Sequence, residues 1–147
     1  MVTVFYADTS AIVSAFLADE PDHGPLRRLL LTGTHDVLTS ELTRIEFASA
    51  VVAAEKRQRI PDAEAVLVQF DEDAQSGLFD LIPLRRKMIL APARRLVINN
   101  FPLRTLDALH LAVALHDAPQ LIGEPITFVT RDQRQADAAK ANGLQVR

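Results

Sequence analysis

Four carboxylic acids lie in or beside apolar segments of this chain and could act together on a metal ion: Asp8, Glu46, Asp107 and Asp132. Two of them follow short apolar runs, and the other two interrupt apolar runs of helical character. Removing an ionised carboxylate from water is costly unless a partner compensates the charge. The 147 residues include no cysteine and no lysine in an apolar run, so the partner that we expect is a divalent cation.

The chemistry that such a set would perform is hydrolysis of a phosphodiester. Oxygen ligands without histidine or cysteine favour Mg²⁺ or Mn²⁺ over zinc. Such an ion lowers the pKa of a bound water and polarises a phosphoryl oxygen. A neighbouring carboxylate can then act as the general base or position the water.

Each acid also has a simpler structural explanation. Asp8 and Asp132 stand at predicted helix starts, where aspartate is a leading N-cap residue. Asp107 precedes His110 by three residues on one helix face, so the two could form a pair. His110 itself fits a structural histidine better than a metal ligand, and the remaining histidines lack ligand spacing. Glu46 resists such explanations because its neighbours are mostly apolar.

Strand-like apolar runs alternate with helix-like segments along the chain. Strands are predicted over residues 2–7, 36–39, 78–84, 125–130 and 144–146, and helices over about 9–17, 25–31, 40–59, 62–76, 85–99, 103–117 and 132–142. This alternation predicts a single α/β domain over residues 1–147, with a central parallel sheet of about four to five strands and helices on both faces. The segment Pro119–Glu124 is predicted to be an irregular surface loop.

The predicted fold allows the four acids to meet. In open α/β sheets, ligands bind beyond the carboxyl ends of the strands, near the point where the strand order reverses. Asp8 and Asp132 follow predicted strands, while Glu46 and Asp107 lie in the first turns of helices that begin at the same edge. Their spacing in the sequence does not by itself require convergence.

Composition narrows the range of functions. The absence of cysteine excludes disulfides, zinc–thiolate sites and thiol catalysis. Without the four acids the remaining charges are 16 basic and 15 acidic, so the net charge of −3 does not exclude a polyanionic substrate. Thirteen of the basic residues are arginine, which binds phosphate in a bidentate way. With no membrane-spanning run and no basic N-terminal leader, we expect a cytoplasmic protein and no membrane partner.

Four short motifs give the chain a resemblance to PIN-domain ribonucleases, and among these to VapC-type toxins of type II toxin–antitoxin systems. The motifs run over Tyr6–Ala11, Glu41–Val51, Leu106–Ala112 and Phe128–Asp132, with one of the four acids in each. The third motif is distinctive, and the ordered set spans nearly the whole chain. The resemblance implies an endoribonuclease that cuts RNA at an acidic site holding Mg²⁺ or Mn²⁺.

The resemblance also implies roles for individual residues. The implied metal ligands and catalytic acids, in decreasing order of weight, are Asp8, Asp107, Glu46 and Asp132. Ser10 and Thr130 match positions where the family often places a hydroxyl that supports the acids or a water. Toxins of this kind form homodimers and are silenced by a cognate antitoxin that blocks the site. The main departure from the family is the extended Pro119–Glu124 loop.

Arginines near the predicted acidic edge are the expected phosphate contacts. Arg131 adjoins Asp132, and Arg44 and Arg104 each precede an acid by two or three residues. The chain has no tryptophan, one tyrosine and seven phenylalanines, so few aromatic side chains are available to stack on RNA bases. Specificity is therefore expected to depend on RNA shape.

Two other functions suit a small parallel α/β domain. A phosphoryl-receiving signalling domain needs an acidic pair after the first strand, but Asp8 has no acidic neighbour. A PIN-like module that binds RNA or protein without cleaving it stays open as the alternative. The presence of all four acids argues for the nuclease.

Overall fold

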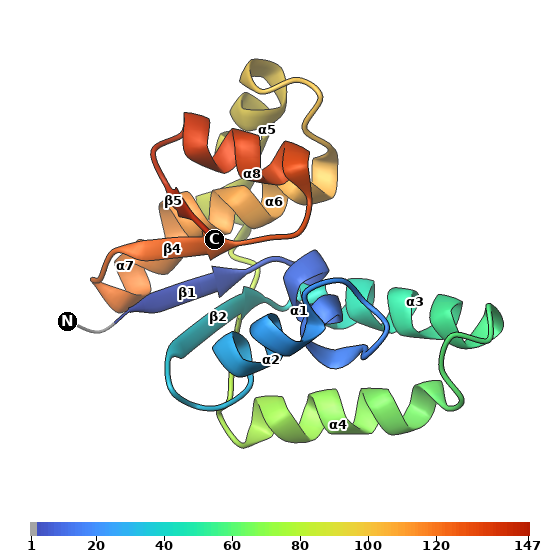
Figure 1. The fold of residues 1–147 in the computed structure, drawn as a ribbon. Coiled ribbons are helices and arrows are strands. Elements are labelled where there is room, and N and C mark those ends of the chain that lie inside the picture. The colour runs from blue at the N-terminus through green and yellow to red at the C-terminus, as the bar shows by residue number, and fades with distance from the viewer. Residues whose placement is uncertain (1–2) are drawn as a thin grey trace.

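A computed structural model describes residues 3–147 and contains one five-stranded parallel sheet between two layers of helices (Figure 1). The strands are β1 Val4–Ala7, β2 Asp36–Ser40, β3 Asp80–Ile82, β4 Ile126–Val129 and β5 Gln145–Val146. Their spatial order is β3-β2-β1-β4-β5. The predicted parallel α/β fold is confirmed, although Val2 of the first predicted strand lies outside the described residues.

The helices follow the predicted order with shifted ends. They are α1 Thr9–Phe16, α2 His23–Leu30, α3 Leu42–Lys56, α4 Ala63–Gln75, α5 Arg86–Asn99, α6 Thr105–Ala112, α7 Ala118–Ile122 and α8 Gln133–Ala141. Figure 1 shows α1–α4 on one side of the sheet and α5–α8 on the other. No helix in the described part of the chain is both long and apolar enough to cross a membrane.

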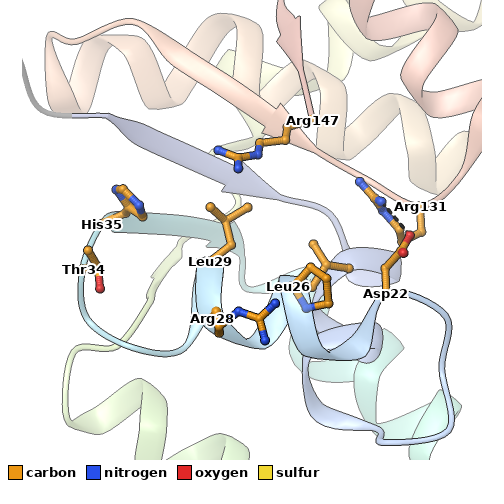
Figure 2. A pocket seen from close by; sticks show the side chains of 9 residues that line it. Asp22, Leu26, Arg28, Leu29, Thr34, His35, Arg131 and Arg147 are labelled. Carbon is orange, nitrogen blue, oxygen red and sulfur yellow. Dashed lines mark hydrogen bonds and ion pairs between the residues drawn. The ribbon is translucent and has the colours of Figure 1, made fainter.

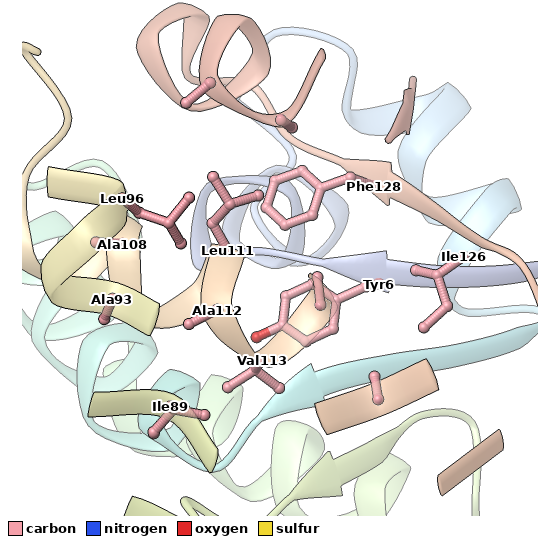
Figure 3. Packing of buried hydrophobic residues seen from close by; sticks show 14 of the residues in the cluster. Tyr6, Ile89, Ala93, Leu96, Ala108, Leu111, Ala112, Val113, Ile126 and Phe128 are labelled. Carbon is pink, nitrogen blue, oxygen red and sulfur yellow. The ribbon is translucent and has the colours of Figure 1, made fainter. Parts of the chain in front are cut away.

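The sheet separates two hydrophobic cores because successive side chains of a strand point to opposite faces. In β1, Phe5 and Ala7 pack into the core beneath α1–α4. Val4 and Tyr6 face the other core, where Tyr6 stacks on Phe128 of β4 with the ring centroids 5.5 Å apart (Figure 3). Burial on both faces explains why all four residues of β1 are apolar or aromatic.

The prediction that Pro119–Glu124 forms an irregular loop is wrong. This segment contains most of α7, which ends at Gly123 with a positive φ of 72°. Proline is tolerated in the first turn of a helix, where its missing N–H would lack an intrahelical partner in any case. The segment thus continues the preceding helical chain.

The predicted helix over residues 103–117 is two different structures. After α6 the chain widens into a π-helical turn, η1, over Val113–Asp117. Asp117 is fully buried there and pairs with Arg85, which precedes α5. This partner is distant in sequence, so the local pattern of apolar residues gave no sign of the turn.

The strand order reverses between β1 and β4. The chain builds β2 and β3 on one side of β1, then returns to place β4 and β5 on the other. The register pairs Ala7 with Val129, so the residues that follow these two strands emerge side by side. Ligands bind at such a reversal in α/β sheets.

Candidate active site

One hollow of about 460 Å³ at the carboxyl ends of the strands collects all four predicted acids. Asp8 follows β1, and Asp132 precedes α8. Glu46 lies in the second turn of α3, and Asp107 lies in the first turn of α6. Other polar side chains that line this acidic hollow are Thr9, Ser10, Ser14, Glu20, His110 and Arg131.

Asp8 is buried and held by three donors. Its Oδ1 accepts hydrogen bonds from the Ser10 hydroxyl at 2.6 Å and from the Ala11 backbone N–H at 3.1 Å. Its Oδ2 accepts from the Thr130 hydroxyl at 2.5 Å. The Ala11 bond caps α1, so the structural explanation of Asp8 is confirmed. Ser10 and Thr130 thus both contact the acid that they were expected to support.

Ser10 and Thr130 also join the loops that follow β1 and β4. Their hydroxyl oxygens lie 3.2 Å apart. Ser10 Oγ accepts from the backbone N–H of Arg131, and Thr130 Oγ1 accepts from that of Asp132. These bonds fix the position of Asp132 relative to Asp8.

Glu46 belongs to a second network. Its Oε1 accepts from the Thr9 hydroxyl at 2.8 Å and lies 2.7 Å from Nε2 of His110. Nδ1 of His110 lies 2.8 Å from the hydroxyl of the buried Tyr6. A carboxylate only accepts, so Nε2 carries the proton toward Glu46. The prediction that His110 pairs with Asp107 is wrong, because its ring contacts Glu46 instead.

Asp107, in the first turn of α6, and Asp132, the N-cap residue of α8, lie where these two helices meet. Asp132 caps α8, accepting at Oδ1 from the backbone N–H groups of Arg134 and Gln135, so its capping explanation is confirmed too. The buried Gln135 donates its amide to the backbone oxygen of Asp107 at 3.0 Å, which joins the two helices. The side chain of Asp107 is half-buried at the wall of the hollow.

Comparison with known proteins identifies the family. The sequence matches the family model described as PIN domain over residues 5–141. The chain belongs to the PIN-domain family. It is 33% identical over 150 aligned residues to Ribonuclease VapC46 of Mycobacterium tuberculosis, and the alignment covers 99% of this chain and 97% of that protein.

A solved structure shares the fold. The crystal structure of VapC20 from Mycobacterium tuberculosis, described as a toxin that cleaves the Sarcin-Ricin loop, matches with a TM-score of 0.64. The match covers 95% of each chain at 18% sequence identity. The predicted PIN fold is therefore supported by both sequence and structure.

Three acids of this PIN domain have shifted pKa values, and the shifts differ in direction. Burial raises the pKa of Asp8, although charge and hydrogen bonds oppose the shift. Burial, then the charges of Asp132 and Asp8, raise the pKa of Asp107. Burial would also raise the pKa of Glu46, but the hydrogen bond and charge of His110 outweigh it and the net shift is downward. The hollow therefore holds acids that a cation would stabilise in ionised form.

The donor set fits a hard divalent cation, which membership of the family implies. Within residues 3–147, no three His, Asp or Glu side chains come close enough to hold one ion between them. Mg²⁺ commonly keeps several waters and takes one or two carboxylates together with substrate phosphates. Asp8 and Asp107 both line the acidic hollow and supply two such carboxylates. They are close enough that the charge of Asp8 raises the pKa of Asp107.

The three predicted RNA-binding arginines lie in different places. Arg131 lines the acidic hollow, and its Nη1 donates to Asp22 at 3.0 Å. Arg44 lines a separate hollow and donates to Asp71 of α4 at 3.2 Å. Arg104 is exposed just before α6. In the described chain only Arg131 joins the acids.

Thr9 and His110 are site residues that were not predicted from the sequence. Thr9 follows Asp8 directly, and His110 lies one helical turn after Asp107. This closeness in sequence to two of the acids was the signal that could have identified both residues. Their hydrogen bonds with Glu46 cross 37 and 64 residues of sequence, which no local pattern shows.

Proposed function

We propose that this PIN domain is a metal-dependent endoribonuclease that hydrolyses RNA phosphodiester bonds as the toxin of a toxin–antitoxin pair. The observation that carries the proposal is the convergence of four carboxylates, from four separate segments, on one hollow at the reversal of the strand order. Membership of the PIN-domain family and the 33% identity to a protein named as a ribonuclease support it.

Asp8 and Asp107 are the proposed ligands for Mg²⁺ or Mn²⁺. Burial raises the pKa of both acids, so a bound cation would favour the ionised form of each. When bound, the ion supplies a more acidic water and stabilises charge on the phosphoryl oxygen. The hydroxyl groups of Ser10 and Thr130 hold the carboxylate of Asp8 in one orientation.

Glu46 is the proposed general base. Its lowered pKa keeps it ionised at neutral pH. Thr9 and His110 both bind Oε1, so Oε2 is left for a water in the described part of the hollow. A carboxylate fixed in this way can accept a proton from the attacking water.

Asp132 is the proposed fourth and most replaceable acid. Its Oδ1 is committed to the backbone of α8, and its Oδ2 lies 3.7 Å from a guanidinium nitrogen of Arg134. What it adds to the site is negative charge beside Asp107. A second ion or additional waters would use that charge.

The remaining parts of the proposal concern partners. A toxin of this family would act in the cytoplasm as a homodimer and be silenced by a cognate antitoxin that covers the acidic hollow. A small neighbouring gene encoding a DNA-binding protein is the expected genetic context. Co-expression of that protein with this chain should yield one complex without nuclease activity.

Cleavage of labelled RNA tests the proposed activity. The purified chain is incubated with an unstructured oligonucleotide and with a hairpin, in Mg²⁺ and in Mn²⁺, beside Asp8→Asn and Asp107→Asn. We expect internal cleavage by the wild type and a loss of at least about 100-fold in both variants. Asp71→Asn, which lies on α4 outside the hollow, is the matched control and should cleave normally.

The same assay separates the two candidate functions. Equal activity in all four proteins would contradict the proposal, because a contaminating nuclease gives that result. Tight RNA binding by the wild type without cleavage in either metal would favour the non-cleaving PIN-like module.

A further inference from the structure

A second hollow, of about 400 Å³, lies beside the acidic one. Figure 2 shows the side chains that line it. Leu26, Arg28 and Leu29 of α2 line one wall. Arg147, after β5, lies above β1, with its guanidinium carbon 6.0 Å from the centroid of the Phe5 ring. The pair of Arg131 and Asp22 closes one end of this hollow (Figure 2).

This hollow adjoins the acidic one. Arg131 lines both. A third hollow of about 350 Å³ shares Arg131 and Asp132 with the acidic hollow and shares Arg131 and Arg147 with the second. Because the three hollows share lining residues, one extended RNA strand could lie across the acids and both neighbouring hollows. We call the second and third hollows together the basic trough.

The charges change sign along this path. The trough is lined by four permanently cationic side chains, Arg28, Arg131, Lys140 and Arg147. Its two carboxylates are already engaged, Asp22 with Arg131 and Asp132 with the first turn of α8. Carboxylates repel phosphates, so a strand held at the acids needs cations where it leaves them.

We propose that the basic trough binds the phosphodiester backbone of the RNA strand on one side of the cleaved bond; this inference rests on the proposed nuclease function. Arg28 and Arg147 are exposed and free to meet phosphates in the bidentate way that arginine favours. These arginines reach the backbone and not the bases, so they add affinity without sequence preference.

Asp22 limits this binding by holding Arg131. Asp22 has a left-handed backbone, with φ of 61°, and its side chain makes no capping bond to α2. Asparagine is well tolerated in that conformation. Asp22→Asn therefore removes one negative charge and weakens the hold on Arg131, and no capping bond to α2 is lost.

The test is RNA binding in a background that does not cleave. Fluorescence anisotropy measures the Kd of a labelled 12-nucleotide single strand for Asp107→Asn, alone and combined with Asp22→Asn or Arg147→Gln, at several salt concentrations. We expect Asp22→Asn to tighten binding about two- to fivefold and Arg147→Gln to weaken it by a similar factor. The slope of log Kd against log salt concentration should change by about 0.7 for each phosphate that a cation newly neutralises or releases.

Asp71→Asn is the matched control for Asp22→Asn. It removes the same charge from a similar exposed ion pair, with Arg44, in a hollow that does not join the acids. Kd should not change in this variant. Equal tightening by Asp22→Asn and Asp71→Asn would overturn the inference, because net charge alone would then explain the effect.

The remaining outcomes also decide the inference. Unchanged Kd and salt slope in both trough variants, or no RNA binding at all, would overturn it and would leave the trough to an acidic protein segment. Because binding is read without cleavage, a wild type that binds RNA through the trough but never cuts it supports this inference while contradicting the proposed function.

Discussion

At the scale of single residues, the four acids are held in different ways, and the difference sorts their roles. Asp8 has three donors and Glu46 has two partners, but the pKa of Asp107 is raised first by burial and then by the like charges of Asp132 and Asp8. A side chain with a raised pKa and few partners weakens the metal-free fold. Asp107 therefore contributes to function at a cost to stability.

Asp107→Asn should stabilise the metal-free protein. The folded pKa of Asp107 lies above its ordinary value of 3.8, so this group destabilises the fold increasingly as pH rises through that range. The gain should be absent near pH 3 and reach less than about 1 kcal/mol at pH 7, since the group is only half-buried. Urea unfolding in EDTA at both pH values measures it, and a loss of stability at pH 7 would count against the interpretation.

His110→Ala should slow RNA cleavage about 10- to 100-fold with little change in KM. The imidazole orients Oε1 of Glu46 and is itself fixed by the Tyr6 hydroxyl. Partners that orient active carboxylates commonly contribute this much to rate. Single-turnover kinetics measures the effect. An unchanged rate in a folded variant would show that Glu46 needs no orienting partner.

At the scale of elements, the N-cap residues of α1 and α8 have a structural role and a proposed functional role together. Asp8 and Asp132 cap α1 and α8 with the same carboxylates that line the hollow. Substitutions that differ in capping ability can separate the two contributions. From the sequence, capping and metal binding stood as alternatives, but the structure makes capping part of how the acids are placed.

Asp132→Ala and Asp132→Ser should have different stabilities and similar activities. Serine can still accept from the backbone N–H groups of Arg134 and Gln135, whereas alanine cannot. The alanine variant should lose about 1 kcal/mol in free energy of unfolding, and the serine variant little. Thermal and urea unfolding, read beside RNA cleavage, test this. Equal stabilities would contradict the cap.

The ion pair between Arg85 and Asp117 should stabilise the chain between α5 and α7. Asp117 is fully buried at the end of the π-helical turn, and Arg85 satisfies both of its carboxylate oxygens. Arg85→Ala should therefore cost about 1–3 kcal/mol in free energy of unfolding, without changing the acids of the hollow. Urea unfolding measures the cost. A variant as stable as the wild type would show that water replaces the guanidinium.

What the sequence could predict at this scale was periodic and local. Alternating apolar runs predicted the strands and most helices, and the strand ends predicted where Asp8 and Asp132 lie. The π-helical turn was missed because its buried Asp117 pairs with Arg85, 32 residues away, and α7 after it was missed as well. The His110–Glu46 pair was missed because it depends on how α3 and α6 meet across the sheet.

At the scale of the whole molecule, the strand order decides where chemistry can occur. The reversal between β1 and β4 brings together segments from the start, the middle and the end of the chain. The acidic hollow forms at that reversal, and the basic trough continues from it along α2 and β5. The sequence indicated the acids, but the trough depends on how α2 packs against the sheet.

The most direct test of the metal-dependent site is the rate of RNA cleavage as a function of Mn²⁺ concentration, measured for wild type, Asp107→Asn and the control Asp71→Asn. The wild type and Asp71→Asn should show the same saturable dependence on Mn²⁺ and no cleavage in EDTA. Asp107→Asn should be inactive or need at least about tenfold more Mn²⁺. Cleavage that persists in EDTA, or one curve shared by all three proteins, would contradict a metal-dependent site at these acids.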